Sequence, residues 1–123
     1  MSKPEVPHHG VVFDLSAVAT ELRELEGYHR DGHIARTLVR EEDLRVVLIV
    51  ATAGARITEH QAKDTVSIHT VHGNVRLTLS GDDGVDLSAG QVLVLEGALP
   101  HDVEALTEST LLLTLGGRRK SRP

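Results

Sequence analysis

The chain lacks cysteine and tryptophan and has few aromatic side chains of any kind. Its 123 residues contain no cysteine, which excludes disulfide bonds, thiol nucleophiles and thiolate metal ligands. Aromatic residues make up 2% of the sequence, with Phe13 and Tyr28 as the two examples. Stacking platforms for nucleic-acid bases and aromatic cradles for sugars are therefore excluded as well.

The chain also lacks an excess of positive charge and any long apolar run. Lysine and arginine number 13 against 18 aspartate and glutamate residues, a formal net charge of −5, so phosphate backbones exert no general attraction on it. The longest apolar run, Val46 to Ala51, is too short to cross a bilayer, and we expect no secretory leader. We therefore expect a cytoplasmic protein without nucleic-acid or membrane partners.

Length and composition describe one globular domain with short tails. Forty per cent of the residues are hydrophobic and 25% are charged, which is ordinary for a folded chain of this size. Residues 1–10 hold two prolines and no periodic pattern, and residues 117–123 form a basic terminus that begins with glycine. We therefore place a single domain at residues 11–116, between a flexible N-terminal arm and a flexible basic tail.

One short helix is predicted near the N-terminus. Apolar residues recur there at the three- and four-residue spacing of a single helix face, at Leu15, Val18, Ala19, Leu22 and Leu25. Asp14 or Ser16 can cap the start of this helix, and Gly27 suits the left-handed residue at its end. No second helix is expected between Gly27 and Gly116.

The rest of the chain has the pattern of short β-strands. Aliphatic and β-branched runs alternate with clusters of glycine, aspartate and asparagine. The expected strands are 34–39, 44–51, 55–59, 65–71, 75–79, 85–87, 91–95, 101–105 and 109–115. Turn residues at 72–74 and 80–84 predict hairpins. Many short strands at even spacing indicate a sandwich, a barrel or a jelly roll, whose edges favour closure or dimerisation.

Two of the eight histidines, His60 and His101, are distinguished by their spacing from nearby glycines. Histidine is the commonest nitrogen ligand of divalent metals and the usual general base at neutral pH. His60 stands six positions after Gly54 and is followed by Gly73, while His101 stands eleven positions after Gly90. These two histidines are therefore the candidate functional residues.

The spacing of these glycines and histidines resembles the two motifs of the cupin superfamily. The resemblance covers roughly Val46 to Leu115 and implies a double-stranded β-helix barrel. The expected fold is therefore an all-β cupin jelly roll with one short N-terminal helix. Cupins of this size commonly pair, so a homodimer is expected as well.

The resemblance also implies a metal site, of which this sequence retains half. In cupins the first motif supplies two histidines and a glutamate, and the second motif supplies one histidine. His60 and His101 stand at two of those four positions, whereas Ala62 replaces the second histidine and Val66 replaces the glutamate. Because catalytic metals normally have at least three protein ligands, two histidines alone make an incomplete site.

A third ligand would have to come from the loops next to the two motifs. The nearby carboxylates are Glu59, Asp64 and Glu96, and water or a bound ligand is a further source. With such a third ligand, the pair His60 and His101 would hold a divalent ion such as Zn, Fe, Mn, Ni or Cu.

The wall of the predicted pocket is mainly apolar. Beside the two histidines, we expect it to be lined by Thr58, Ala62, Val66, Ile68, Val103 and Ala105. Because side chains alternate along a strand, Ile68, Thr70 and His72 are predicted on the face of Val66, and His69 on the opposite face. Such a pocket suits a small organic ligand with or without a metal.

Three functions remain open from the sequence. The first is a cupin of unassigned reaction whose barrel binds a divalent metal through His60 and His101, a small organic ligand, or both. The second is a metal-free module that binds or senses a small molecule without catalysis. The third is a scaffold whose interface matters and whose barrel does nothing. Whether the protein is an enzyme is left undecided.

Overall fold

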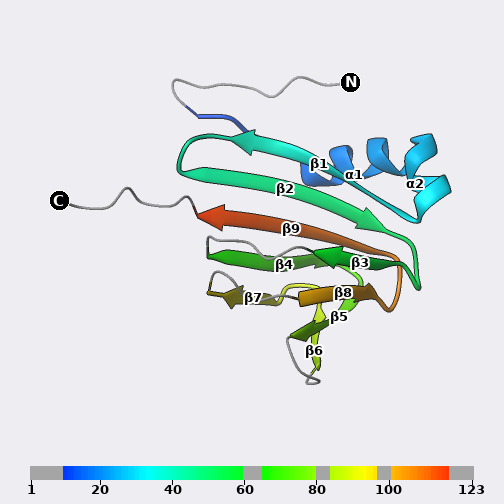
Figure 1. Cartoon of the computed structure of the whole chain (residues 1–123). Coiled ribbons are helices and arrows are strands. Elements are labelled where there is room, and N and C mark those ends of the chain that lie inside the picture. The colour runs from blue at the N-terminus through cyan, green and yellow to red at the C-terminus, as the bar shows by residue number, and fades with distance from the viewer. Residues whose placement is uncertain (1–9, 60–64, 80–83, 97–100, 117–123) are drawn as a thin grey trace.

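The protein is represented by a computed structural model that describes residues 10–59, 65–79, 84–96 and 101–116, with the backbone alone for Glu59 and His101. The described residues form two helices and nine strands (Figure 1). In chain order they are α1 (Leu15–Arg23), α2 (Glu26–Asp31), β1 (His33–Arg40), β2 (Leu44–Ala51), β3 (Arg56–Glu59), β4 (Val66–His72), β5 (Asn74–Leu79), β6 (Gly84–Ser88), β7 (Val92–Leu95), β8 (His101–Ala105) and β9 (Ser109–Gly116). The N-terminal arm and the basic tail lie outside the described residues, apart from Gly10, so the predicted domain limits stay a prediction.

The nine strands form two antiparallel sheets. The first has the order β1-β2-β9-β4-β7 and the second has the order β3-β8-β5-β6. Every strand expected from the sequence is present, with ends within one residue of those predicted. The all-β jelly roll is therefore confirmed, and Figure 1 shows α1 and α2 beside β1 and β2 as an additional layer. Among the described residues, neither helix has the length and apolar character needed to span a membrane.

An aliphatic core fills the space between the two sheets. Its buried members come from eight strands, β2 to β9, and from neither helix. Where one strand supplies two of them they are two residues apart, because every second side chain of a strand points inward. They are Ile49, Ala51, Ile57, Val66, Ile68, Val75, Leu77, Leu87, Leu95, Val103, Ala105, Leu111 and Leu113. We call this set the interior core.

A smaller core lies between the helices and the outer face of the first sheet. Ala19 and Leu22 of α1 and Tyr28 of α2 pack there against Leu48 and Val50 of β2. The carboxylate of Asp14 accepts a hydrogen bond from the Ala17 amide at 3.0 Å, as expected of a helix N-cap. The outward residues of β2 are thus covered, and this buried strand has apolar side chains on both faces.

The second helix, α2, corrects the prediction of a single helix. The apolar stripe continues past the end of α1, but Leu25 has an extended ψ of 148° and starts a new helix. Gly27 lies inside α2, and the left-handed residue is Gly32, with φ 83°. Tyr28, which is 5% exposed, anchors α2 in the smaller core. This burial outweighs the modest cost of a glycine within the helix.

The turn at 72–74 also differs from the prediction in one respect. Gly73 has φ 88°, as turn chemistry predicts, but β4 and β5 belong to different sheets. The turn is therefore a corner between sheets and not a hairpin. A Cβ atom at Gly73 would collide with the carbonyl oxygen of Glu108 and with Ser109. The turn at 80–84 lies outside the described residues, except for Gly84.

A β-bulge in β4 overturns the predicted orientation of His72. The pairing of β4 with β9 shifts register between Thr70 and His72, and such a shift inserts one extra residue. Val66, Ile68 and Thr70 are buried as predicted, whereas His72 is exposed. His72 therefore does not share the face of Val66.

Candidate functional site

The end of β3, the start of β4, the end of β7 and the start of β8 lie at one end of the barrel, which we call the motif end. Glu59, the last residue of β3, pairs through its backbone with His101, the first residue of β8. His101 also pairs with Leu79 of β5. In the other sheet, Val66 pairs with Leu95, and the chain passes between the sheets here, from β3 to β4 and from β7 to β8. Residue 60 follows Glu59 directly, but His60 itself lies outside the described residues.

The predicted wall residues fall into three groups. Val66, Ile68, Val103 and Ala105 belong to the interior core and are at most 4% exposed. Thr58 is exposed and alternates with the buried Ile57, so the structure places it on the outside of the barrel and away from those four. Ala62 lies outside the described residues. The apolar part of the predicted wall is thus assembled, and its use as a ligand pocket stays a prediction.

The described residues do not fit a complete cupin metal centre. Val66, at the position of the family's glutamate, is 3% exposed and packed in the interior core, and a valine side chain has no donor atom. Glu96 is exposed just after β7, and Asp64 lies outside the described residues. Within the described part of the chain, no three histidine, aspartate or glutamate side chains gather into a group that could hold a metal ion. His60 and His101 stay predicted ligands.

Thr70 is a polar residue in the barrel interior. From the sequence, only its position on the same strand face as Val66 was predicted. Its side chain is 0% exposed, and its hydroxyl has no hydrogen-bond partner among the described residues. The backbone N–H of Thr70 donates to the Gln91 carbonyl at 3.0 Å. Four residues along β4 separate Thr70 from Val66, or about 13 Å. The hydroxyl therefore lies deep in the barrel relative to the motif end.

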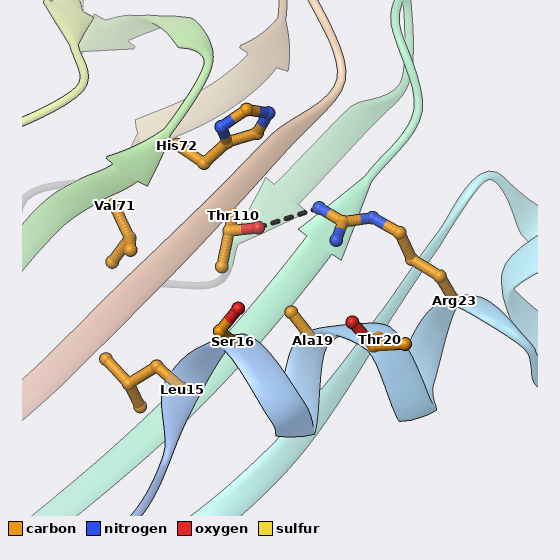
Figure 2. A pocket seen from close by; sticks show the side chains of 8 residues that line it. All are labelled: Leu15, Ser16, Ala19, Thr20, Arg23, Val71, His72 and Thr110. Carbon is orange, nitrogen blue, oxygen red and sulfur yellow. Dashed lines mark hydrogen bonds between the residues drawn. The ribbon is translucent and has the colours of Figure 1, made fainter.

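The structure also contains a hollow that the sequence analysis missed, on the outer face of the first sheet. It measures about 370 Å³ and lies between α1 and the ends of β4 and β9 (Figure 2). From α1 it is lined by Leu15, Ser16, Ala19, Thr20 and Arg23, and from the strands by Val71, His72 and Thr110. We call it the helix groove. A sequence signal was present, because Ser16, Thr20 and Arg23 form one polar row beside the apolar stripe of α1.

Arg23 closes one side of the helix groove by bridging α1 to β9. Its Nη2 donates to the Thr110 hydroxyl at 2.7 Å and to the Ser109 carbonyl at 3.5 Å. Its Nε lies 3.0 Å from a carboxylate oxygen of Glu108, yet this buried nitrogen has no partner with hydrogen-bond geometry among the described residues. We therefore treat the contact between Arg23 and Glu108 as an ion pair and not as a hydrogen bond.

Comparisons with known proteins identify the fold. No protein-family model and no curated protein matches the chain. Among solved structures, a conserved protein of unknown function from Streptococcus pyogenes is similar with a TM-score of 0.72 and 22% identity, over 98% of each chain. A cupin superfamily protein from Desulfitobacterium hafniense is similar with a TM-score of 0.66 and 15% identity, over 70% of this chain and 78% of that one.

A third similar structure is KdgF from a Halomonas species. Its TM-score is 0.62 and its identity is 27%, over 72% of this chain and 82% of that chain. The topology and the spacing of the two motifs agree with these likenesses, and at such identities the likenesses speak for architecture and not for activity. This chain therefore has the fold of the cupin superfamily.

Proposed function

We propose that this small cupin protein binds a small, mainly apolar organic molecule at the motif end of its barrel, without a metal. His60 and His101 would supply the polar contacts, and Val66, Ile68, Val103 and Ala105 the apolar wall. Small-molecule sites generally combine such a wall with a few well-placed polar groups. The proposal includes a cytoplasmic location for the protein.

One observation carries the proposal, namely the buried valine at the position where cupins have a metal-binding glutamate. Val66 is 3% exposed and pairs with Leu95 on one side and Leu115 on the other. A carboxylate at this place would be desolvated at a cost of several kcal/mol unless a metal or a cation paired with it. With valine there, the wall is uncharged and favours apolar groups over hydrated ions.

Thr70 supports the same proposal from deeper in the barrel. Its buried hydroxyl without a partner is costly in an apolar interior. A polar atom of a ligand, or a water molecule, would satisfy it.

A metal-dependent function is the second candidate, and one observation favours it. The backbone pairing of Glu59 with His101 sets a carboxylate-bearing residue directly opposite one of the two histidines. If His60, His101 and Glu59 acted together, they would make the two-nitrogen, one-oxygen donor set found in some catalytic zinc sites. Such a metal would polarise a carbonyl or activate water.

Thermal unfolding with a ligand panel separates the two candidates. Protein purified without an affinity tag would be melted in EDTA with small apolar acids, ketones and alcohols, and then with divalent metals alone. Because a ligand that binds only the folded state raises its stability, we expect stabilisation by organic compounds in EDTA, reduced in His101→Ala. His69→Ala is the matched control, since His69 lies on the other face of β4. Stabilisation by metals alone would favour the second candidate and overturn the first.

A homodimer is part of the proposal. β7 is an edge strand of the first sheet, and its Val92 and Val94 are 54% and 61% exposed. A second copy of the chain that packs on these valines would protect the open edge of the sheet and bury the exposed apolar surface. We expect a dimer in sedimentation velocity and a shift toward monomer in Val94→Glu, whereas a monomeric wild-type protein would contradict the prediction.

A further inference from the structure

We propose that the helix groove binds the carboxylate of a short aliphatic acid, as a second site separate from the motif end. The groove lies on the outer face of the first sheet, against α1, whereas the wall of the motif end belongs to the interior core. It is built at the Thr70 end of β4, past the bulge, and not at the Val66 end. The two sites therefore share no lining residue.

The sequence of α1 gives the groove one polar wall. Residues four and three apart on a helix lie on one face, so Ser16, Thr20 and Arg23 form a row of two hydroxyls and one guanidinium. The neighbouring row, Leu15 and Ala19, packs toward the sheet and forms the apolar floor. The helix thus offers aliphatic and hydrogen-bonding groups side by side.

The strands give the opposite wall because of the bulge in β4. Without the extra residue, His72 would point into the barrel like Thr70. With it, Val71 and His72 both line the groove. Figure 2 shows Val71 facing the Leu15 end, and His72 and Thr110 lying toward the Arg23 end. The groove therefore has an apolar end and a polar, partly cationic end.

The guanidinium of Arg23 is held in place before any ligand arrives. Its bond to Thr110 at 2.7 Å and its ion pair with Glu108 fix it across the end of the groove. These contacts use Nη2 and Nε, and Nη1 has no partner among the described residues. A planar guanidinium with free N–H groups recognises a carboxylate well, and a pre-set side chain loses little entropy on binding.

The polarity of the groove selects the class of ligand. A linear aliphatic carboxylate would place its tail on Leu15, Ala19 and Val71 and its head group between Arg23 and His72. An aliphatic ammonium ion of the same length would be repelled, because it and the guanidinium of Arg23 are both positively charged. The carboxylate of Glu108 already offsets part of the charge of Arg23, so a bound carboxylate must compete with Glu108 for the guanidinium. Substitution of Glu108 therefore tests the site.

Hexanoate is the probe that we would use, followed by two-dimensional NMR of the full chain. We expect saturable shifts of the amide signals of Ala19, Thr20 and Val71, stronger than those caused by acetate, which lacks the tail. Hexylammonium should cause none. Shifts confined to core residues at the motif end, or equal shifts from hexanoate and hexylammonium, would overturn the proposal.

Paired variants at Thr20 test the site without removing Arg23. Thr20 is an exposed residue of α1, and both glutamate and glutamine are good helix formers, so Thr20→Glu and Thr20→Gln should both fold. We expect Thr20→Glu to weaken hexanoate binding about tenfold, because one charge-assisted contact is opposed by a like charge. Thr20→Gln should change it less than about threefold.

Glu108→Gln and Arg23→Gln should act in opposite directions. Removal of the competing carboxylate should strengthen hexanoate binding about threefold or more, and loss of the guanidinium should weaken it about tenfold. Arg76→Gln, which removes a more exposed ion-paired arginine on the other sheet, is the control and should leave binding unchanged. If Arg23→Gln fails to fold, the hexanoate affinities of the two Thr20 variants and of Glu108→Gln still test the proposal. Equal affinity in Thr20→Glu and Thr20→Gln would contradict the proposal.

Discussion

The two faces of the first sheet are built from the same strands but differ in chemistry. The inner face packs on the second sheet and is aliphatic almost throughout, with Thr70 and Ser109 as buried polar exceptions. On the outer face, helices cover β1 and β2, and Arg23 and Thr110 form a polar contact at the edge of that cover. The comparison teaches that the aliphatic inner face holds most of the buried apolar contacts, whereas polar groups on the outer face gather where the helix layer ends.

The largest expected effect comes from a charge placed on the inner face. Val66→Glu should lower the free energy of unfolding by about 4 kcal/mol, because a buried carboxyl without a partner is strongly disfavoured. Ser67→Glu, one residue along on the outer face, should cost no more than about 1 kcal/mol. Urea unfolding in EDTA measures both, and equal costs would contradict the assignment of faces.

Adjacent leucines of β9 test the same difference without charge. Leu111 is 1% exposed in the interior core, whereas Leu112 is half-buried beside the smaller core. Leu111→Ala should cost about 3 kcal/mol and Leu112→Ala about 1 to 2 kcal/mol, because the deeper site cannot collapse around the cavity. Urea unfolding again gives the values, and a larger cost at Leu112 would reverse our ranking of the two cores.

Substitution of two glycines with the same backbone conformation separates the cost of backbone strain from the cost of a steric clash at the new Cβ atom. Gly73 and Gly54 both have φ 88°, but a Cβ at Gly73 would meet the backbone of Glu108, and one at Gly54 would meet nothing within 4 Å. We expect Gly73→Ala to cost about 2 to 3 kcal/mol and Gly54→Ala about 1 kcal/mol. Thermal melts should rank them so, and indistinguishable melts would show that the corner at Gly73 is looser than described.

The smallest expected effect lies on the exposed surface of the second sheet. Arg76 pairs with Asp86 across β5 and β6 at 2.7 Å, and its hydrogen bond lowers the pKa of that carboxyl. A depressed carboxyl pKa adds stability above the ordinary pKa of aspartate, and this is lost as pH falls through the lowered value. Because the pair is exposed, Asp86→Asn should change the melting temperature barely at pH 7 and not at all at low pH. A large change at pH 7 would contradict this.

The strands were predictable because alternation and turn residues are local signals. All nine follow from apolar periodicity. The second helix was missed because the apolar spacing of α1 runs on to Leu25, and the sequence does not reveal that Gly32, five residues after Gly27, is the left-handed end. The bulge before His72 was missed for a similar reason, since it is set by pairing with β9 and not by β4 alone.

The candidate sites were predictable to different degrees. The motif spacing led to Val66, Ile68, Val103 and Ala105, which the fold does bring together. Thr58 lies on the outer face of β3, because it alternates with Ile57, which belongs to the interior core. The helix side of the groove has a sequence signal in the polar row of α1, but its strand side could not be predicted, because Arg23 and Thr110 meet across 87 positions of sequence and only the packing of α1 on the sheet joins them.

The most direct test of the central claim is the metal content of the protein after loading. Untagged protein would be incubated in turn with Zn²⁺, Mn²⁺, Ni²⁺, Cu²⁺ and Fe²⁺, freed of unbound ion by gel filtration, and analysed for bound metal. The apolar wall around Val66 predicts far less than one ion per chain for each metal, with no difference between the wild type and His101→Ala. One ion per chain in the wild type, lost in His101→Ala, would contradict the account.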